Sequence, residues 1–188
     1  MYFLWLFATA FLIISIFSSN WPIKLYHYLL LQRLARELKT EPKKHGLLLS
    51  NVYSEIITGY RGKNIKIRFI ENSVDSIKAY SGLEIRIKET AGLVMEIYRV
   101  RLNKREWGDF RRFTSGDGQI DPEWLILTTD PEGAKEMWDR TRLAGLLKTT
   151  PQLDQILINQ EEIIVQLKRY PSTQSVLNII DRIVSCFP

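Results

Sequence analysis

Residues 83–88 read Leu-Glu-Ile-Arg-Ile-Lys, and residues 65–69 read Ile-Lys-Ile-Arg-Phe. Both stretches alternate apolar with charged side chains, so each predicts a β-strand with one buried face and one solvated face. Residues 61–64, Arg-Gly-Lys-Asn, are typical of a turn and come directly before residues 65–69. Such connections are too short for parallel strands, which need a crossover of about a dozen residues or more. The sequence therefore predicts antiparallel hairpins.

Further extended stretches and two helices complete the predicted domain. Asp130-Pro131-Glu132 is typical of a helix start, with an acidic N-cap, proline at the first helical position and an acid in the first turn. We expect that helix to run to about Leu147, and a last helix with an apolar stripe to begin near Ser172. The fold class is therefore expected to be α+β, with two helices packed on an antiparallel sheet. The further strands are expected at residues 47–58, 93–102, 120–129, 153–158 and 163–168.

The amino-terminal stretch, Met1–Phe17, is almost wholly apolar, and the first charged residue of the chain is Lys24. A helix that crosses about 30 Å of hydrocarbon needs roughly 20 such residues. Residues 1–21 are therefore expected to form a transmembrane anchor. A cleaved signal peptide is the alternative, but it needs a basic segment before its apolar region, and none precedes Tyr2. We expect the anchor to be retained.

Residues 22–44 are expected to form a basic amphipathic helix beside the membrane, followed by the domain of residues 45–188. The helix has an apolar stripe at helical spacing, and it fits two arrangements equally: packing on its own domain, or lying among headgroups or against a partner subunit. The stripe consists of Leu30, Leu31, Leu34 and Leu38. The residues expected at the membrane interface are Trp21, Lys24, Tyr26, Tyr28, Arg33 and Arg36.

The charges predict an orientation. Residues 22–44 hold six basic residues against two acidic ones, and no side-chain charge precedes them. The positive-inside rule then places the amino terminus outside and the carboxy-terminal domain in the cytoplasm of a single-pass cell (inner) membrane protein. Because this segment carries most of the net charge of +5, the basic balance does not predict a nucleic-acid partner. The single cysteine, Cys186, excludes an internal disulfide and agrees with a reducing compartment.

No pattern of residues predicts catalysis, a cofactor or a metal site. Asp109, Asp117 and Asp121 fall within thirteen residues, but their spacing matches no EF-hand loop, and Asp117 lies between two glycines as turn residues do. His27 and His45 both lie beside the membrane segment, and His27 is expected to be an interfacial ring. Nucleophile-elbow, Walker and dinucleotide-binding motifs do not occur.

The stretch 99–113 is the most unusual part of the predicted domain. It holds six basic residues against two acidic ones, with three aromatic rings between them. Such a mixture binds anionic headgroups or phosphates, or forms a partner-binding surface, or is a solvated loop whose rings fold back on the core. We name it the basic aromatic patch: Arg99, Arg101, Lys104, Arg105, Trp107, Phe110, Arg111, Arg112 and Phe113.

These patterns together indicate a non-catalytic protein that serves as an accessory, assembly or scaffolding subunit of a membrane complex. Its expected partners are the lipid bilayer and other membrane protein subunits. The first alternative is a domain that senses lipid or a phosphorylated ligand at the membrane surface through the basic aromatic patch. The second is a membrane-tethered enzyme whose acids, Asp109, Asp121 and Asp130, meet only in the fold.

Overall fold

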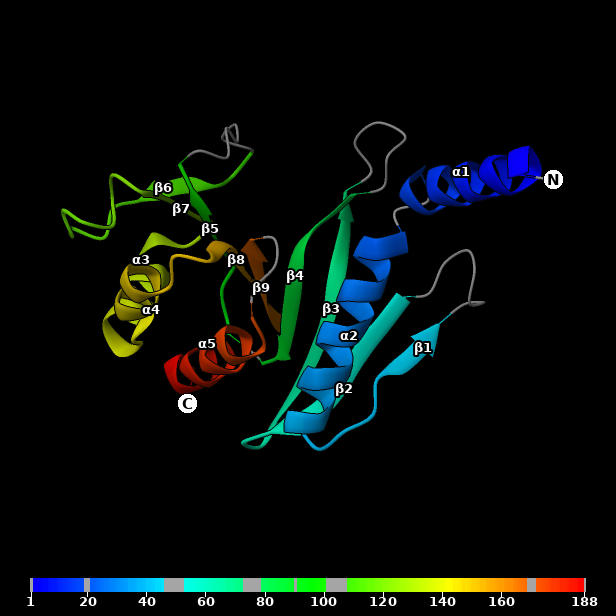
Figure 1. Cartoon of the computed structure of the whole chain (residues 1–188). Helices are drawn as coiled ribbons and strands as arrows, with labels where there is room; N and C mark the ends of the chain where they lie inside the picture. The colour runs from blue at the N-terminus through cyan, green and yellow to red at the C-terminus, as the bar shows by residue number, and fades with distance from the viewer. Residues whose placement is uncertain are drawn as a thin grey trace.

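A computed structural model (Figure 1) describes residues 2–18, 21–45, 53–72, 79–89, 91–100, 108–168 and 172–187. In these ranges the helices are α1 (Tyr2–Ser18), α2 (Trp21–Glu37), α3 (Pro131–Arg140), α4 (Leu143–Thr149) and α5 (Thr173–Cys186). The strands are β1 (Lys43–His45), β2 (Tyr53–Tyr60), β3 (Lys63–Asn72), β4 (Ala79–Lys88), β5 (Met95–Arg99), β6 (Arg111–Phe113), β7 (Trp124–Thr128), β8 (Leu153–Ile158) and β9 (Glu162–Lys168).

The strands form one sheet in the order β1-β2-β3-β4-β9-β8-β5-β7-β6. Every neighbouring pair is antiparallel, which confirms the predicted α+β class and its antiparallel sheet. The hairpin β8–β9 lies between β4 and β5, so two strands that follow one another in the sequence are separated in the sheet. The last hairpin of the chain therefore joins the two halves of the sheet, β1-β2-β3-β4 and β5-β7-β6.

The alternating stretches behave as predicted. Ile65 pairs with Ile87 and Ile67 with Ile85, and all four side chains are buried on the same face. The turn before β3 consists of Arg61 and Gly62, whose φ angles are 49° and 80°. Two consecutive positive φ angles are the geometry of the two-residue hairpin turns whose twist matches that of the strands.

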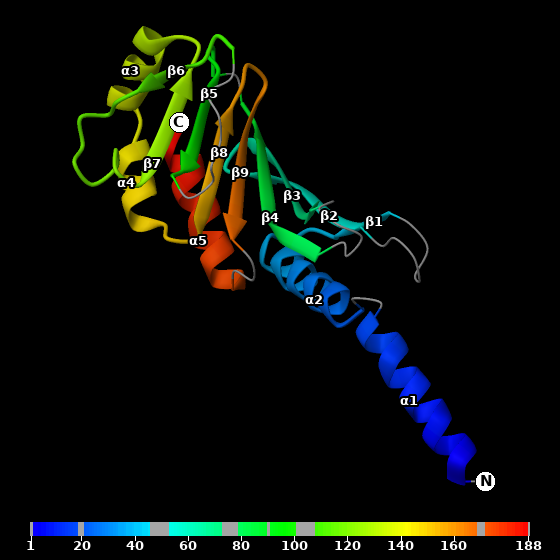
Figure 2. The ribbon, with the colours of Figure 1, turned by 90° about the horizontal axis from the view of Figure 1, so that it is seen from above.

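Helices cover the buried face of the sheet. Figures 1 and 2 show α2 and α5 lying across this face, with α3 and α4 near the β6–β7 end. The predicted helix 130–147 is in fact two helices, with Thr141 in extended conformation between them. One continuous helix would place Leu143 and Leu147 on the side opposite Ala134, because each residue turns the helix by about 100°. The break turns both leucines to the core, where they are 0% and 2% exposed.

The helix α2 belongs to the core of the domain. Leu30, Leu31, Leu34 and Ala35 are at most 5% exposed and join the same buried cluster as the sheet and α5. The structure thus favours the first of the two arrangements predicted for residues 22–44, a helix packed on its own domain. The predicted domain boundary at residue 45 excludes α2, whose inner side is part of this core.

The structure does not support the transmembrane anchor predicted for residues 1–21. Among the residues that the structure describes, no helix is both long and apolar enough to cross a membrane. The helix α1 has 17 residues and ends at Ser18, and Trp21 already belongs to α2.

Candidate membrane and partner surfaces

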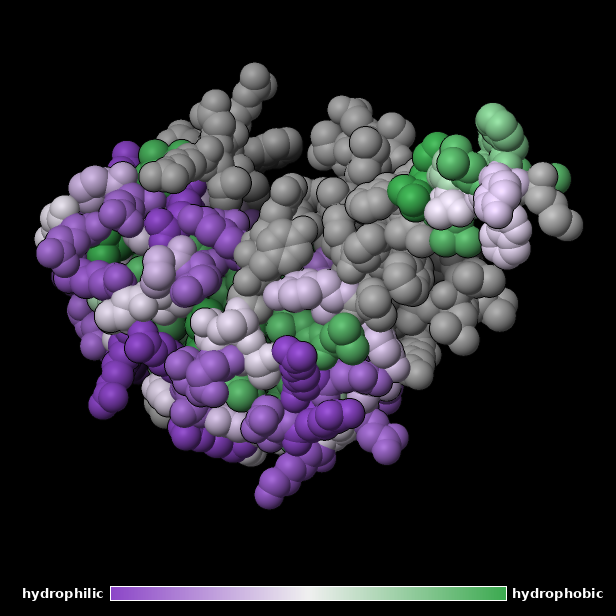
Figure 3. Space-filling view, in the orientation of Figure 1, coloured by the Kyte–Doolittle hydropathy of each residue, from purple (hydrophilic) through white to green (hydrophobic). Residues whose placement is uncertain are grey.

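The helix α1 is mainly apolar, and its described side chains, residues 2–14, are exposed. Phe3, Trp5 and Phe11 are 81%, 74% and 74% exposed, and the helix carries no charged residue. Its hydroxyl at Thr9 donates to the carbonyl of Trp5 at 2.6 Å, so this polar group is satisfied within the helix. Figure 2 shows α1 projecting from the domain beyond α2, and Figure 3 shows it as a mainly apolar body. An all-round apolar helix is stable only where apolar groups surround it.

The outer side of α2 forms a second exposed surface, which we call the α2 stripe: Tyr26, Leu29, Arg33 and Arg36. These four residues are spaced by three, four and three, so they share one side of the helix. The stripe contains three of the predicted interfacial residues. Tyr28 is half-buried and accepts a hydrogen bond from the Gln32 amide at 2.6 Å. The side chains of Trp21 and Lys24 lie outside the described residues.

The prediction for His27 is wrong, because its ring is in the core. It is 5% exposed and stacks on Phe69 with 3.7 Å between ring centroids. Burial lowers the pKa of His27 to about 4, so the imidazole is neutral at physiological pH. The ring therefore serves packing and does not face the membrane. His45 lies in the edge strand β1, and its side chain is outside the described residues.

The basic aromatic patch is divided by the structure. Arg99 is largely buried by Trp124, whose ring centroid is 4.6 Å from the guanidinium carbon. Its guanidinium donates to the carbonyls of Leu153 at 2.8 Å and Pro151 at 3.3 Å. It also lies 3.6 Å from a carboxylate oxygen of Glu123. Arg99 thus ties β5 to the start of β8, and it belongs to a strand of the sheet, where it is neither in a solvated loop nor free to bind a ligand through these contacts. Arg101, Lys104, Arg105 and Trp107 lie outside the described residues.

The exposed remainder of the patch is on β6, the last strand of the sheet. Arg111 and Arg112 are exposed, and neither makes an ion pair with any described residue. Phe113 turns inward and packs on Trp138 with 5.8 Å between ring centroids, while Phe110 is half-buried. The described part of the patch therefore offers two guanidinium groups at a free sheet edge.

The acidic candidates hold local structure. Asp121 accepts hydrogen bonds from the backbone N–H groups of Ser115 at 2.9 Å and Gly116 at 3.0 Å. Asp117 pairs with Lys148 at 2.5 Å, and this contact holds the pKa of Asp117 below its usual value. These are the contacts of the polar turn that the sequence predicts. No group of three His, Cys, Asp or Glu residues within the described ranges could hold a metal ion.

The two other acids proposed for an enzyme also have simple surroundings. Asp130 is the N-cap of α3 and accepts from the Gly133 N–H at 3.0 Å, as predicted from the sequence. Asp109 is exposed on a turn before β6.

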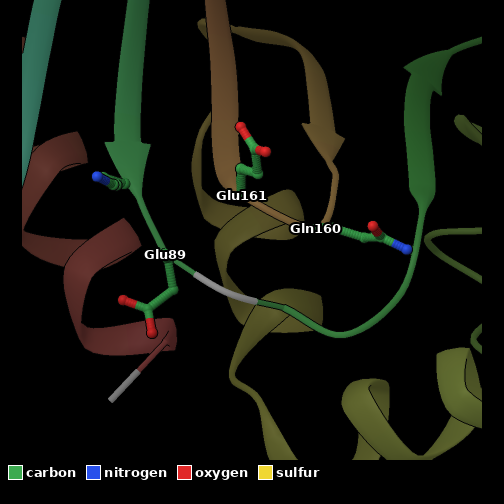
Figure 4. Close-up of a pocket in the computed structure, with 4 residues that line it drawn as sticks. Glu89, Gln160 and Glu161 are labelled. Atoms are coloured by element: carbon green, nitrogen blue, oxygen red, sulfur yellow. The ribbon is translucent and has the colours of Figure 1, made fainter.

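A polar hollow of about 630 Å³ lies between the end of β4 and the β8–β9 turn. It is lined by Lys88, Glu89, Gln160 and Glu161. Figure 4 shows that the carboxylates of Glu89 and Glu161 point in different directions. The Glu89 carboxylate is bound by the Lys63 ammonium at 2.6 Å. These side chains provide no pair of converging acids.

A buried ion network lies on the sheet face away from the helices. Glu84 is 4% exposed, and one of its carboxylate oxygens lies 2.6 Å from Nε of both Arg68 and Arg86. Burial alone raises the pKa of Glu84, but the hydrogen bonds from the two arginines outweigh it and hold that pKa below its usual value. Arg86 also pairs with Glu162 at 2.9 Å. The alternation of charges predicts a solvated face here, and it does not predict a buried carboxylate.

Comparison with known proteins gives a likeness in fold. No protein-family model matches the chain, and no curated protein sequence matches it. A solved structure with a similar fold is the crystal structure of the mycobacterial trehalose monomycolate transport factor A, TtfA. The two chains superpose with a TM-score of 0.60 over 81% of this chain and 89% of that one, at 13% sequence identity. The likeness at this identity is one of fold.

Proposed function

We propose that this chain is a non-catalytic, membrane-attached accessory or assembly subunit of a membrane protein complex. The observation that carries the proposal is α1, an exposed and almost wholly apolar helix without charge that projects from a folded domain. Burying apolar surface gains about 25 cal/mol per Å², so the helix is drawn into a membrane or an apolar partner. The local roles of Asp121 and Asp130 support the non-catalytic part of the proposal.

The likeness to a transport factor supports a finer form of the proposal, an accessory role in lipid transport. TtfA is named a trehalose monomycolate transport factor, and the likeness covers 89% of its chain. We infer for the present chain an accessory role in lipid transport, without assigning the lipid. The domain would serve the complex as a binding module.

The proposal includes an orientation. Basic residues outnumber acidic ones by six to two between residues 22 and 44, and such residues favour the cytoplasmic side of a membrane. The domain then lies in the cytoplasm, on the side of the membrane that these basic residues favour.

The surface proposed for a partner subunit is the edge strand β6. It is separated from β1 by the whole sheet, which at about 4.8 Å per strand is roughly 40 Å. Arg111 and Arg112 are exposed there, away from α1 (Figure 1). Arginine is over-represented among the residues that dominate protein interfaces, which supports a partner at this edge.

Membrane attachment is tested by placing charges in α1. We expect Phe7→Lys with Phe11→Lys to move the protein from the membrane to the soluble fraction, because each lysine costs about 3 kcal/mol at the centre of an apolar segment. The matched control is Val100→Lys, which charges an exposed apolar residue of the domain that is 53% exposed. Retention of the α1 variant in membranes after alkaline washing would reject α1 as the attachment.

The partner surface is tested in mild detergent, which removes the bilayer. Arg111→Glu with Arg112→Glu should abolish co-purification of the partner subunit, while Arg33→Glu with Arg36→Glu should leave it unchanged. Thermal unfolding of both variants checks that the fold is intact. Equal recovery of the partner with both variants would place its binding site elsewhere.

A further inference from the structure

The α2 stripe changes character along the helix. Tyr26 and Leu29 are 41% and 44% exposed, and the two arginines follow toward the carboxy-terminal end. The ten helical steps from Tyr26 to Arg36 span about 15 Å. Figure 3 shows the same order on the surface, with apolar groups over the middle of α2 and hydrophilic groups farther from α1.

The apolar part of the stripe is the part nearer to α1. The helix α1 ends at residue 18 and α2 begins at residue 21, and the figures place the amino-terminal end of α2 beside α1. Figure 1 also shows that the two helices run in clearly different directions. If α1 is buried in the apolar phase, the stripe starts at the interface with an aromatic and a leucine side chain. The arginines then reach the depth of the headgroups, as is typical of interfacial helices.

The two arginines of the stripe are exposed. Neither Arg33 nor Arg36 forms an ion pair within the part of the chain that the structure describes. The exposed residues that follow are Glu37, Lys39, Glu41 and Lys43, so cations outnumber acids in this region by four to two. A planar guanidinium binds phosphate oxygens with two parallel hydrogen bonds, which makes arginine well suited to a phosphodiester.

We propose that the α2 stripe binds the phosphate groups of anionic lipids at the membrane surface. This inference rests on the proposed attachment through α1, which brings the stripe to the bilayer. The inner side of α2 is fixed in the core by Leu31 and Leu34, so binding needs no movement of the helix. The domain is then held in one orientation on the surface, with β6 turned away toward a partner.

The test compares full-length protein on vesicles of phosphatidylcholine alone and on vesicles with added phosphatidylglycerol. The measured quantity is the ratio of the two partition coefficients. A basic residue near an anionic surface contributes about 1 kcal/mol, which is about fivefold in binding. We expect Arg33→Gln with Arg36→Gln to lower the ratio by about 25-fold, and added salt to lower the ratio of the unaltered protein.

The matched control is Arg111→Gln with Arg112→Gln, which removes two exposed arginines from the far edge of the sheet and should keep the full ratio. An unchanged ratio in the α2 variant would overturn the inference, as would an equal loss in both variants. Binding to neutral vesicles reports separately on α1. If neutral vesicles retain every variant but the ratio never changes, the stripe proposal fails while the attachment through α1 stands.

Discussion

At the scale of single residues, the domain contains a histidine that folding keeps neutral. His27 is 5% exposed against Phe69, and burial lowers its pKa to about 4. The unfolded chain has an ordinary imidazole with a pKa of about 6.5. Between about pH 6.5 and pH 4 the imidazole is mostly protonated in the unfolded state and mostly neutral in the folded state. Folding stability is therefore fully present above about pH 6.5 and is lost as the pH falls toward 4.

This linkage gives the first prediction. For the unaltered protein, the histidine contributes a loss of about 2 kcal/mol in unfolding free energy between pH 7 and pH 5. His27→Leu removes the titrating group. The unfolding free energy of this variant should therefore fall by about 2 kcal/mol less than that of the unaltered protein over the same pH interval. Urea unfolding at both pH values measures it. Equal losses for the two proteins would mean that His27 does not titrate differently on folding.

A glycine in β4 gives the second prediction. A Cβ atom at Gly82 would lie 2.1 Å from the carbonyl oxygen of Leu167 in β9, whereas a Cβ atom at Gly59 in β2 would meet nothing within 4 Å. Gly82→Ala forces the two central strands apart, and we expect it to cost about 3 kcal/mol. Gly59→Ala should be neutral or slightly stabilising, because it restricts the unfolded chain. Denaturant midpoints compare them, and equal stability would contradict the close approach of β4 and β9.

Single residues also show which contacts can be predicted from the sequence. The caps Asp130 and Ser172 are predictable because their side chains bond backbone groups only three residues away. Arg99 is different: its partners are Trp124 and the carbonyl of Leu153, far along the chain. The composition of residues 99–113 indicates a basic patch, but it does not show which of the guanidinium groups are engaged in contacts within the domain.

At the scale of elements, α2 has two sides with different tasks. Its inner side completes the core, and its outer side carries the α2 stripe. An amphipathic pattern shows that a helix has an apolar side, but it does not identify what covers that side. A membrane surface and a β-sheet require the same spacing. The sequence therefore predicts the helix, and only the structure assigns its inner side to the sheet.

Two leucines of α2 provide a matched test. Leu34 is 0% exposed and Leu29 is 44% exposed. We expect Leu34→Ala to lower the unfolding free energy by about 3 kcal/mol through lost burial and a cavity, and Leu29→Ala to change it by less than about 0.5 kcal/mol. Denaturant unfolding in detergent measures both. Similar small effects would place α2 outside the cooperative domain, and residues 45–188 would then fold without it.

At the scale of the whole molecule, the sheet order is the feature that the sequence does not determine. The β2–β3 and β8–β9 hairpins follow from short turns, and the alternation of residues 65–69 also predicts β3. The pairing of β4 with β9 joins segments about 80 residues apart, and no local pattern specifies it. Likewise, α1 and β6 are both predictable as unusual stretches, but their separation at opposite ends of the molecule appears only in the fold (Figure 1).

This separation makes the orientation measurable with cysteine labelling. The single native thiol, Cys186, is 4% exposed, and burial raises its pKa, so it should resist maleimide. Gly118 is exposed, and a side chain there meets nothing within 4 Å, so Gly118→Cys gives a reporter on the domain. Tyr2, which is 91% exposed, gives a second reporter, Tyr2→Cys, at the far end of α1.

With a membrane-impermeant maleimide added outside intact cells, we expect Gly118→Cys to be protected until the cells are permeabilised. Labelling of Tyr2→Cys in intact cells tests whether the amino terminus reaches the outer surface. The unaltered protein should stay unlabelled in both conditions, which controls for Cys186. Labelling of Gly118→Cys from outside would reverse the orientation inferred from the basic residues after α1. Protection of both reporters would keep the domain in the cytoplasm but reject an amino terminus that reaches the outer surface. In that case α1 would enter the bilayer from the cytoplasmic side, with its apolar side chains still buried in lipid.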